Sequence, residues 1–233
     1  MLDVATGTVV VYSDIACPWS HLCVHRLLAA RSRLGMDGRV LLDHRAFPLE
    51  LVNRRPTPKR VIEAELPVAA GCEPGAGWQV WQRPDWQWPV TTLPALEAVQ
   101  AAKEQGLGVA EQLDRALRVA LFAESRCISM TEVILEVAEG CPAVDAGGLR
   151  SALADGRARR LVIDQYAAID EAGVEGSPHV FLAGGEGTFN PGISMHWEGP
   201  HERGVLIIDE DDPSVYDTLI SAALDPAGAT TAG

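Results

Sequence analysis

The first fifty residues alternate short apolar runs with one amphipathic segment. Residues 8–13 form a run rich in β-branched side chains, which predicts a buried strand. Residues 18–34 space their apolar side chains as a helix does, and residues 39–46 predict a second strand. Two strands joined by a helix indicate a β-α-β unit whose strands run parallel.

The middle of the chain has two parts with different sequence patterns. Residues 48–89 are rich in proline and tryptophan, which predicts an irregular, loop-like stretch. From residue 92 to residue 172 the pattern is helical and is interrupted by glycine and proline, so we expect an all-helical insertion. Its expected helices cover residues 92–105, 109–124, 130–139, 147–154 and 157–172.

The end of the chain returns to strand patterns. Apolar runs at residues 179–183 and 204–208 are followed by a helix expected near residues 213–223, with Asp212 as its N-cap. Residues 225–233 have the composition of a disordered tail. The chain is thus predicted to be α/β, with one domain from residues 1–50 and 173–224 and a loop and helical insertion at residues 51–172.

Candidate chemistry begins where the first strand meets the first helix, at Cys17-Pro18-Trp19-Ser20. Unpaired N–H groups and the dipole at a helix N-terminus favour a thiolate, so Cys17 is the predicted nucleophile, with a depressed pKa. Ser20 lies three residues on, where its hydroxyl can donate to that thiolate. Because Ser20 stands where a C-x-x-C motif has its second cysteine, a mixed disulfide on Cys17 needs an external thiol for its release.

A second predicted part of this site lies about 160 residues further on. Gly176-Ser177-Pro178 precedes the expected strand at residues 179–183, and a proline at the start of a strand is a credible site for a cis peptide bond. In thiol sites of the thioredoxin type, such a proline faces the cysteine, and the residue before it offers backbone groups to an extended substrate. Without this partner, Cys17 is equally well explained as a buried apolar residue.

Four segments in order resemble those of the DsbA-like thioredoxin-fold proteins, namely residues 13–19, 44–51, 93–98 and 176–178. The resemblance is strongest to the FrnE-type cytosolic subgroup, whose relatives include 2-hydroxychromene-2-carboxylate isomerases and kappa-class glutathione transferases. It implies a thioredoxin-like fold with an all-helical insertion and a thiol–disulfide oxidoreductase. Ser20 departs from the pattern, because FrnE-type oxidoreductases usually carry a second cysteine there.

Three functions stay open. The favoured one is a monothiol oxidoreductase or disulfide isomerase, with Cys17, Ser20 and Pro178 as its catalytic residues. The second is a glutathione-dependent isomerase or transferase in which Ser20 and Cys17 activate the cofactor thiol, and the third is a non-catalytic binding module. No tightly bound cofactor is expected; glutathione or another low-molecular-weight thiol is the expected co-substrate, and small-molecule or protein disulfides are the expected partners.

Substrate contacts are expected on both sides of the site. Pro18, Trp19 and Ser177 flank the sulfur in the predicted arrangement. Residues 78–88 hold four of the six tryptophans, so Trp86 and Trp88 are predicted to form one wall of a cleft for a flat apolar ligand. The alternative is a local mini-core that joins the insertion to the rest of the chain.

Composition and charge narrow the function classes. A net charge of −13 argues against nucleic acid or an anionic membrane as a partner. Because the start of the chain does not resemble a secretory signal, we expect a cytoplasmic protein and no disulfide framework among the five cysteines. Their spacing suggests no metal site.

Two residues near the motif have other expected places. Cys23 is expected in the core, and His21 could contact either the thiolate or solvent. Whether the protein forms a homodimer is left open.

Overall fold

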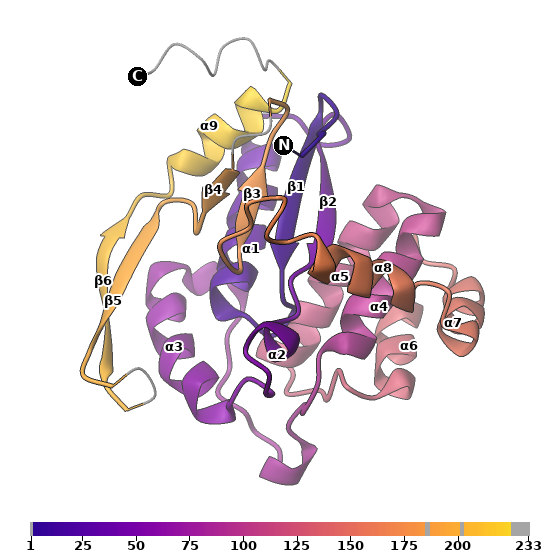
Figure 1. Ribbon diagram of the computed structural model, residues 1–233, viewed down its shortest axis with the longest axis horizontal. Helices are drawn as coiled ribbons and strands as arrows, with labels where there is room; N and C mark the ends of the chain where they lie inside the picture. Colours follow the sequence, from indigo (N-terminus) through magenta and orange to yellow (C-terminus); the bar gives the residue numbers. More distant parts are fainter. Residues whose placement is uncertain (1, 185–186, 201–202, 225–233) are drawn as a thin grey trace.

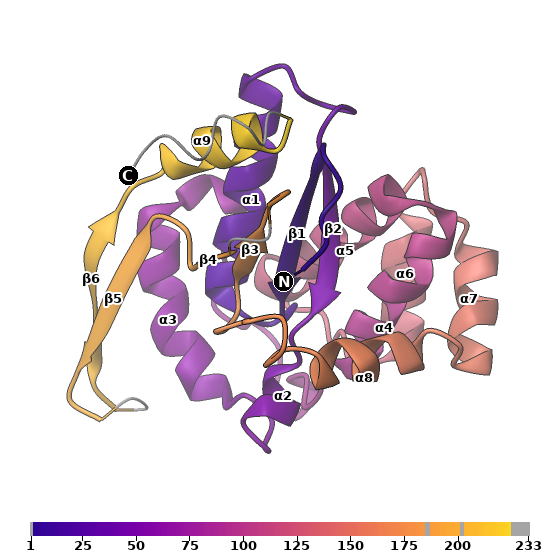
Figure 2. The same ribbon diagram turned by 45° about the horizontal axis from the view of Figure 1, so that its top comes forward.

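The computed structural model describes residues 2–184, 187–200 and 203–224 (Figures 1 and 2). The tail expected at residues 225–233 lies outside these residues. A mixed sheet with strand order β2-β1-β3-β4 runs through the middle of the molecule, and it contains β1 (Thr8–Ser13), β2 (Leu41–Ala46), β3 (His179–Phe181) and β4 (Gly187–Phe189). Strands β1 and β2 are parallel, whereas β3 is antiparallel to both β1 and β4. The predicted β-α-β unit is therefore present.

Alternation along β1 decides which side chains face which layer. Val9 and Val11 belong to a hydrophobic cluster with helices α1 (Pro18–Arg33) and α9 (Val215–Ala222), which pack against each other on one face of the sheet (Figure 1). Val10 and Tyr12 point the opposite way and belong to a cluster with Phe181 of β3. Helix α1 begins at Pro18, shortly after β1 ends at Ser13. The start of the helix therefore lies at the carboxyl end of β1.

Five helices form the insertion. They lie on the β2 side of the sheet in both views and share one large hydrophobic cluster (Figures 1 and 2). Their bounds are α4 (Leu93–Ala102), α5 (Leu107–Phe122), α6 (Thr131–Glu139), α7 (Ala146–Asp155) and α8 (Arg159–Ala167). Each expected helix of the insertion is found, and the α/β architecture with a helical insertion is confirmed.

The stretch predicted as loop-like, residues 48–89, holds two helices. They are α2 (Leu49–Val52) and α3 (Lys59–Cys72), followed by single 3₁₀ turns at Pro74–Ala76 and Asp85–Gln87. Helix α3 buries Val61, Ile62, Leu66 and Ala69 at helical spacing although it contains Pro67. The expectation of an irregular stretch was wrong at α3, because its prolines obscured that spacing.

A two-stranded antiparallel sheet, β5 (Ile193–Glu198) and β6 (Val205–Asp211), follows the central sheet. Helix α3 contacts both α1 and β6, and it lies between the central sheet and this hairpin in both views (Figures 1 and 2). Of these two hairpin strands, β6 overlaps a strand expected from the sequence and β5 does not. Helix α9 begins at Val215 with Ser214 as its N-cap, so the prediction of Asp212 as N-cap was wrong. The Asp212 carboxylate instead accepts from the N–H of Ser214 at 2.9 Å, in the turn before the helix.

Within residues 2–184, 187–200 and 203–224, no helix combines the length and the apolar character needed to cross a bilayer.

Candidate active site

Cys17 and Ser177 meet at the carboxyl end of β1. Cys17 is the N-cap of α1, and the Ser177-Pro178 peptide bond is cis. The Cys17 thiol donates to the carbonyl oxygen of Ser177, with 3.1 Å between sulfur and oxygen. The chain therefore brings together the two predicted parts of the site from positions 160 residues apart.

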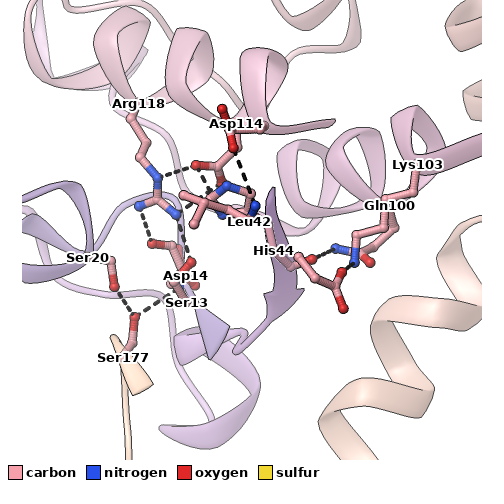
Figure 3. Close-up of polar contacts among 12 residues, drawn as sticks. Ser13, Asp14, Ser20, Leu42, His44, Gln100, Lys103, Asp114, Arg118 and Ser177 are labelled. Atoms are coloured by element: carbon pink, nitrogen blue, oxygen red, sulfur yellow. Dashed lines mark hydrogen bonds and ion pairs between the residues drawn. The ribbon is translucent and has the colours of Figure 1, made fainter. Parts of the chain in front are cut away.

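Two hydroxyl groups lie beside the sulfur. The Oγ atoms of Ser20 and Ser177 are 2.7 Å apart, and Ser177 Oγ also accepts from the N–H of Asp14 at 2.9 Å (Figure 3). Either hydroxyl can donate to the other, and the one that accepts keeps its own proton for the sulfur. The Ser20 hydroxyl, the Ser20 N–H and the Ser177 hydroxyl each favour the Cys17 thiolate and lower its pKa.

Burial opposes these contacts. Cys17 is 5% exposed, and burial raises the pKa of its thiol above the ordinary value. The nearby Glu65 carboxylate also raises this pKa, because one negative charge disfavours a second. The depressed thiol pKa predicted from the helix N-terminus is therefore wrong for this conformation, since burial outweighs the hydrogen bonds that favour the thiolate.

The sulfur nevertheless faces open space. A cavity of about 350 Å³ is lined by Cys17, Pro18, Trp19 and Ser177 on one side and by the segment from Leu49 to Glu65 on the other. Small-molecule sites usually enclose roughly 300–1,000 Å³, so this cavity is in the lower part of that range. The predicted substrate contacts Pro18, Trp19 and Ser177 thus line one space together with Cys17, the predicted nucleophile.

The other two predicted substrate contacts lie elsewhere. Trp86 is 80% exposed and does not line this cavity. Trp88 borders a smaller neighbouring hollow and packs edge-on against Trp81, with 5.0 Å between ring centroids. Trp88 also packs against the hydrophobic cluster of the insertion, which is the arrangement of the mini-core alternative. A substrate contact at Trp86 or Trp88 stays a prediction.

His21 and Cys23 are both buried. His21 Nε2 lies 2.9 Å from the carbonyl oxygen of Ala76, and its ring stacks on Phe122. Burial lowers the pKa of His21 to about 4, so the ring is neutral at physiological pH. Cys23 is 1% exposed in the cluster under α9, and burial raises its pKa to about 12. Cys23 is a free thiol of the core, as the sequence predicted.

Asp14 and Arg118 hold the turn that leads to Cys17. The Asp14 carboxylate accepts from the backbone N–H groups of Ala16 and Leu49, each at 2.9 Å. Arg118 of α5 donates to the Asp14 carbonyl oxygen at 3.0 Å and to Ser13 Oγ at 2.8 Å, and it pairs with Asp114 at 2.7 Å (Figure 3). The helical insertion thus fixes the backbone next to the nucleophile.

Arg118 and Glu65 were not among the residues predicted from the sequence. The signal for Arg118 was present, because Asp114 and Arg118 are four residues apart on a helix whose face also carries Leu113, Leu117 and Leu121. Glu65 is on α3, a helix that the sequence did not predict. Glu65 lines the cavity. Burial raises the pKa of its carboxyl to about 7, and the Trp19 side chain opposes that shift.

The described part of the chain contains no group of three or more histidine, cysteine, aspartate or glutamate side chains placed to bind a metal ion.

Comparisons with known proteins identify the fold. The family model described as "DSBA-like thioredoxin domain" matches residues 8–197. Among the curated proteins, no sequence matches this chain.

Solved structures share the same architecture. The cytosolic disulfide reductase DsbM from Pseudomonas aeruginosa is 17% identical with a TM-score of 0.59, and the match covers 94% of this chain and 100% of that one. A probable DsbA oxidoreductase from Streptomyces coelicolor is 23% identical with a TM-score of 0.63, covering 93% and 89% of the two chains. A 2-hydroxychromene-2-carboxylate isomerase is 19% identical with a TM-score of 0.58, covering 78% and 88%. At these identities the likenesses show a common thioredoxin-like fold.

Proposed function

The chain belongs to the family of DsbA-like thioredoxin domains, and from this premise we propose that it is a thiol–disulfide oxidoreductase or isomerase with Cys17 as its single redox-active thiol. The family match spans both Cys17 and Pro178. The observation that carries the proposal is the position of the Cys17 sulfur, 3.1 Å from the Ser177 carbonyl oxygen and in the wall of the cavity. The family match and the disulfide reductase and oxidoreductase among the similar structures support an enzyme of this class.

The exchange proceeds in two displacements. The Cys17 thiolate attacks one sulfur of a disulfide, forms a mixed disulfide and releases the other sulfur as a thiolate. Ser20 has no sulfur with which to displace the bound group, so a second, external thiolate attacks the mixed disulfide and returns Cys17 as a thiolate. One disulfide is exchanged for another, and the protein undergoes no net oxidation.

The Ser177 carbonyl has a different partner at each stage. In the resting protein it accepts from the Cys17 thiol. Once Cys17 has lost its proton and formed a mixed disulfide, the same oxygen is free to accept an N–H group of the bound substrate. This exchange of partners favours substrates that carry an amide next to their sulfur, such as cysteine-containing peptides.

The cavity size supports a small co-substrate. A space of about 350 Å³ suits a low-molecular-weight thiol or the cysteine end of an extended peptide better than a folded surface. DsbM from Pseudomonas aeruginosa has been solved with GSH, which supports glutathione or an analogue as the external thiol. We propose the cytoplasm as the compartment, as for that cytosolic reductase.

A glutathione-dependent isomerase or transferase is the second candidate. The paired hydroxyls of Ser20 and Ser177 and the raised pKa of Cys17 favour it, because they could hold a cofactor thiolate without a covalent bond to the protein. The 2-hydroxychromene-2-carboxylate isomerase with the same fold supports this alternative.

Mass spectrometry of the protein after incubation with oxidised glutathione separates the two. The oxidoreductase predicts one glutathione adduct, on Cys17, that reduced glutathione removes. The Cys17→Ala variant should form no adduct at that site, and the Cys127→Ala variant, which changes a cysteine remote in sequence from the motif, should behave as the wild type. Unmodified Cys17 in a protein that still binds reduced glutathione would favour the isomerase.

A further inference from the structure

Glu65 shares the cavity with Cys17. Helix α3 contributes Val61, Ile62 and Glu65 to the lining, and the first residues of α1 contribute the opposite side. The Trp19 side chain, two residues after Cys17, favours the Glu65 carboxylate and opposes the rise of its pKa. Of the lining side chains, Glu65 and Arg55 alone carry a formal charge. A carboxyl group and a thiol that face one small space can exchange a proton directly or through one water molecule.

The other charged groups packed around α3 are occupied elsewhere. Arg26 of α1 donates to Asp211 of β6 at 2.6 Å and to Glu73 at 3.1 Å. This cluster lies at the C-terminal end of α3, two turns beyond Glu65 and about 12 Å along the helix axis. Arg55 has its own interactions and lines the cavity from the segment after α2. Glu65 is therefore the carboxylate in this lining that can act on the sulfur.

The two groups also affect each other's protonation. The Glu65 carboxylate raises the pKa of Cys17, and burial raises the pKa of Glu65 to about 7. Since two negative charges in one buried space are unfavourable, ionisation of one group favours protonation of the other. Near neutral pH, the Cys17 thiol keeps its proton, and an ionised Glu65 carboxylate can accept it.

The nucleophile needs such a partner. Burial keeps the Cys17 thiol protonated. The thiol donates a hydrogen bond to the Ser177 carbonyl oxygen, which is too weak a base to remove the proton. The hydroxyls of Ser20 and Ser177 can stabilise the thiolate once it has formed, but they do not remove the proton of the thiol.

We propose that Glu65 is the proton acceptor and donor for Cys17, a role that rests on the proposed thiol–disulfide exchange. The Glu65 carboxylate takes the proton of the Cys17 thiol, and the resulting thiolate attacks the disulfide. Glu65 then returns this proton to the released thiolate, which departs as a neutral thiol. In the second displacement, Glu65 takes the proton of the incoming thiol and gives it back to Cys17. Glu65 and the reacting sulfur atoms together thus carry one negative charge at every stage.

The test compares Glu65→Gln with Glu63→Gln, a matched loss of one carboxylate on the same helix outside the cavity. Glu63 pairs with Lys59 and does not line the space around Cys17. The rate of Cys17 alkylation by iodoacetamide is measured from pH 5 to pH 10. The wild type and Glu63→Gln should show an inflection near pH 7 in addition to that of the thiol. Glu65→Gln should lose the inflection near pH 7, and its thiol should titrate at lower pH, because no carboxylate opposes the thiolate.

The second readout is the rate of exchange with oxidised glutathione at pH 7. A general acid or base commonly raises the rate of a reaction at least a hundredfold. Because water can replace part of this function, loss of the Glu65 carboxyl should lower the exchange rate by about tenfold or more. Glu65→Gln should therefore exchange at least about tenfold more slowly although its thiol is alkylated as fast as in the wild type or faster. Glu65→Asp, which keeps the carboxyl group, should recover part of the rate. A merely structural role would slow both reactions together.

An alkylation profile of Glu65→Gln that matches the wild type would overturn the inference, as would an exchange rate that rises together with the alkylation rate. These results leave the role of Cys17 intact. By contrast, a wild-type protein that exchanges no disulfide, or a Cys17→Ala variant that exchanges at the wild-type rate, would overturn the proposed function and with it the return of the proton by Glu65.

Discussion

At the scale of single residues, the reactivity of Cys17 is a balance between hydrogen bonds and burial. The hydroxyls of Ser20 and Ser177 favour its thiolate, while burial and Glu65 favour its thiol. The sequence predicts the first contribution, because Ser20 follows Cys17 at helical spacing. It could not predict the second, since the burial of Cys17 depends on how helix α3 and the segment after α2 pack over it.

Replacing Ser20 by alanine removes one donor to the thiolate. A hydrogen bond to a charged group is worth about 1.5–3 kcal/mol, so alkylation of Cys17 at pH 7 should slow by roughly tenfold or more. The Ser32→Ala variant is the control, because Ser32 is an exposed residue of the same helix that bonds Asp37. Equal alkylation rates in the Ser20→Ala variant and the wild type would show that the hydroxyl does not act on the sulfur.

Replacing Ser20 by cysteine restores a C-x-x-C motif. Cys17 and the new cysteine should then form an internal disulfide, so the variant should reduce a disulfide substrate once without any external thiol. Mass spectrometry after oxidation should show a loss of two hydrogens, confined to this pair. Under the same conditions, the wild type should release one thiol of the substrate and keep the other bound to Cys17 as a mixed disulfide. A variant that forms no internal disulfide would mean that the first turn of α1 cannot adopt the necessary geometry.

The raised pKa of Glu65 has a consequence for stability. A carboxyl whose folded-state pKa is raised to about 7 contributes stability that is full below its unfolded value and is lost as the pH rises through 7. The free energy of unfolding of the wild type should therefore fall relative to that of Glu65→Gln between pH 4.5 and pH 8. Urea denaturation of both proteins at these two pH values measures the difference. A difference that does not change with pH would contradict the raised pKa.

At the scale of elements, periodicity predicts a structure wherever the pattern is long. Strand β1, helix α1 and the five helices of the insertion were identified for this reason. Helix α3 was missed because Pro67 lies within it. Strands β4 and β5 were also missed, and length is not the reason, since β5 has six residues. Because α3 was missed, Glu65 was missed too. The sequence singled out Cys17 and Pro178 but not the carboxyl group that lines the same cavity as Cys17.

Helix α5 connects the insertion to the active site through Arg118. Removing one partner of a buried ion pair costs about 3–5 kcal/mol, because the remaining charge is left without compensation. The Arg118→Met variant should therefore lower the free energy of unfolding by about that amount, as measured by urea denaturation. The double variant Arg118→Met with Asp114→Leu should be less destabilised, since it leaves no isolated charge. If the double variant is as unstable as the single one, the contacts of Arg118 with Ser13 and Asp14 carry the stabilisation instead.

At the scale of the whole molecule, the sheet and the insertion converge at the carboxyl end of β1. The turn after β1 carries Asp14 and Cys17, the β3 side supplies Ser177, helix α5 supplies Arg118, and helix α3 closes the cavity with Glu65. Short-range patterns predicted most of these elements, but the cavity exists only where they meet. The resemblance of the motifs to a known family predicted the meeting of Cys17 with Pro178, whereas nothing local in the sequence indicated that α3 would face them.

The most direct measurement is the crystal structure of the protein after reaction with oxidised glutathione. We expect a disulfide bond between Cys17 Sγ and the glutathione sulfur. The tripeptide should lie in the cavity next to Trp19 and Glu65, with one of its N–H groups donating to the Ser177 carbonyl. A free Cys17 thiol, with glutathione attached to another cysteine or bound outside this cavity, would contradict this expectation.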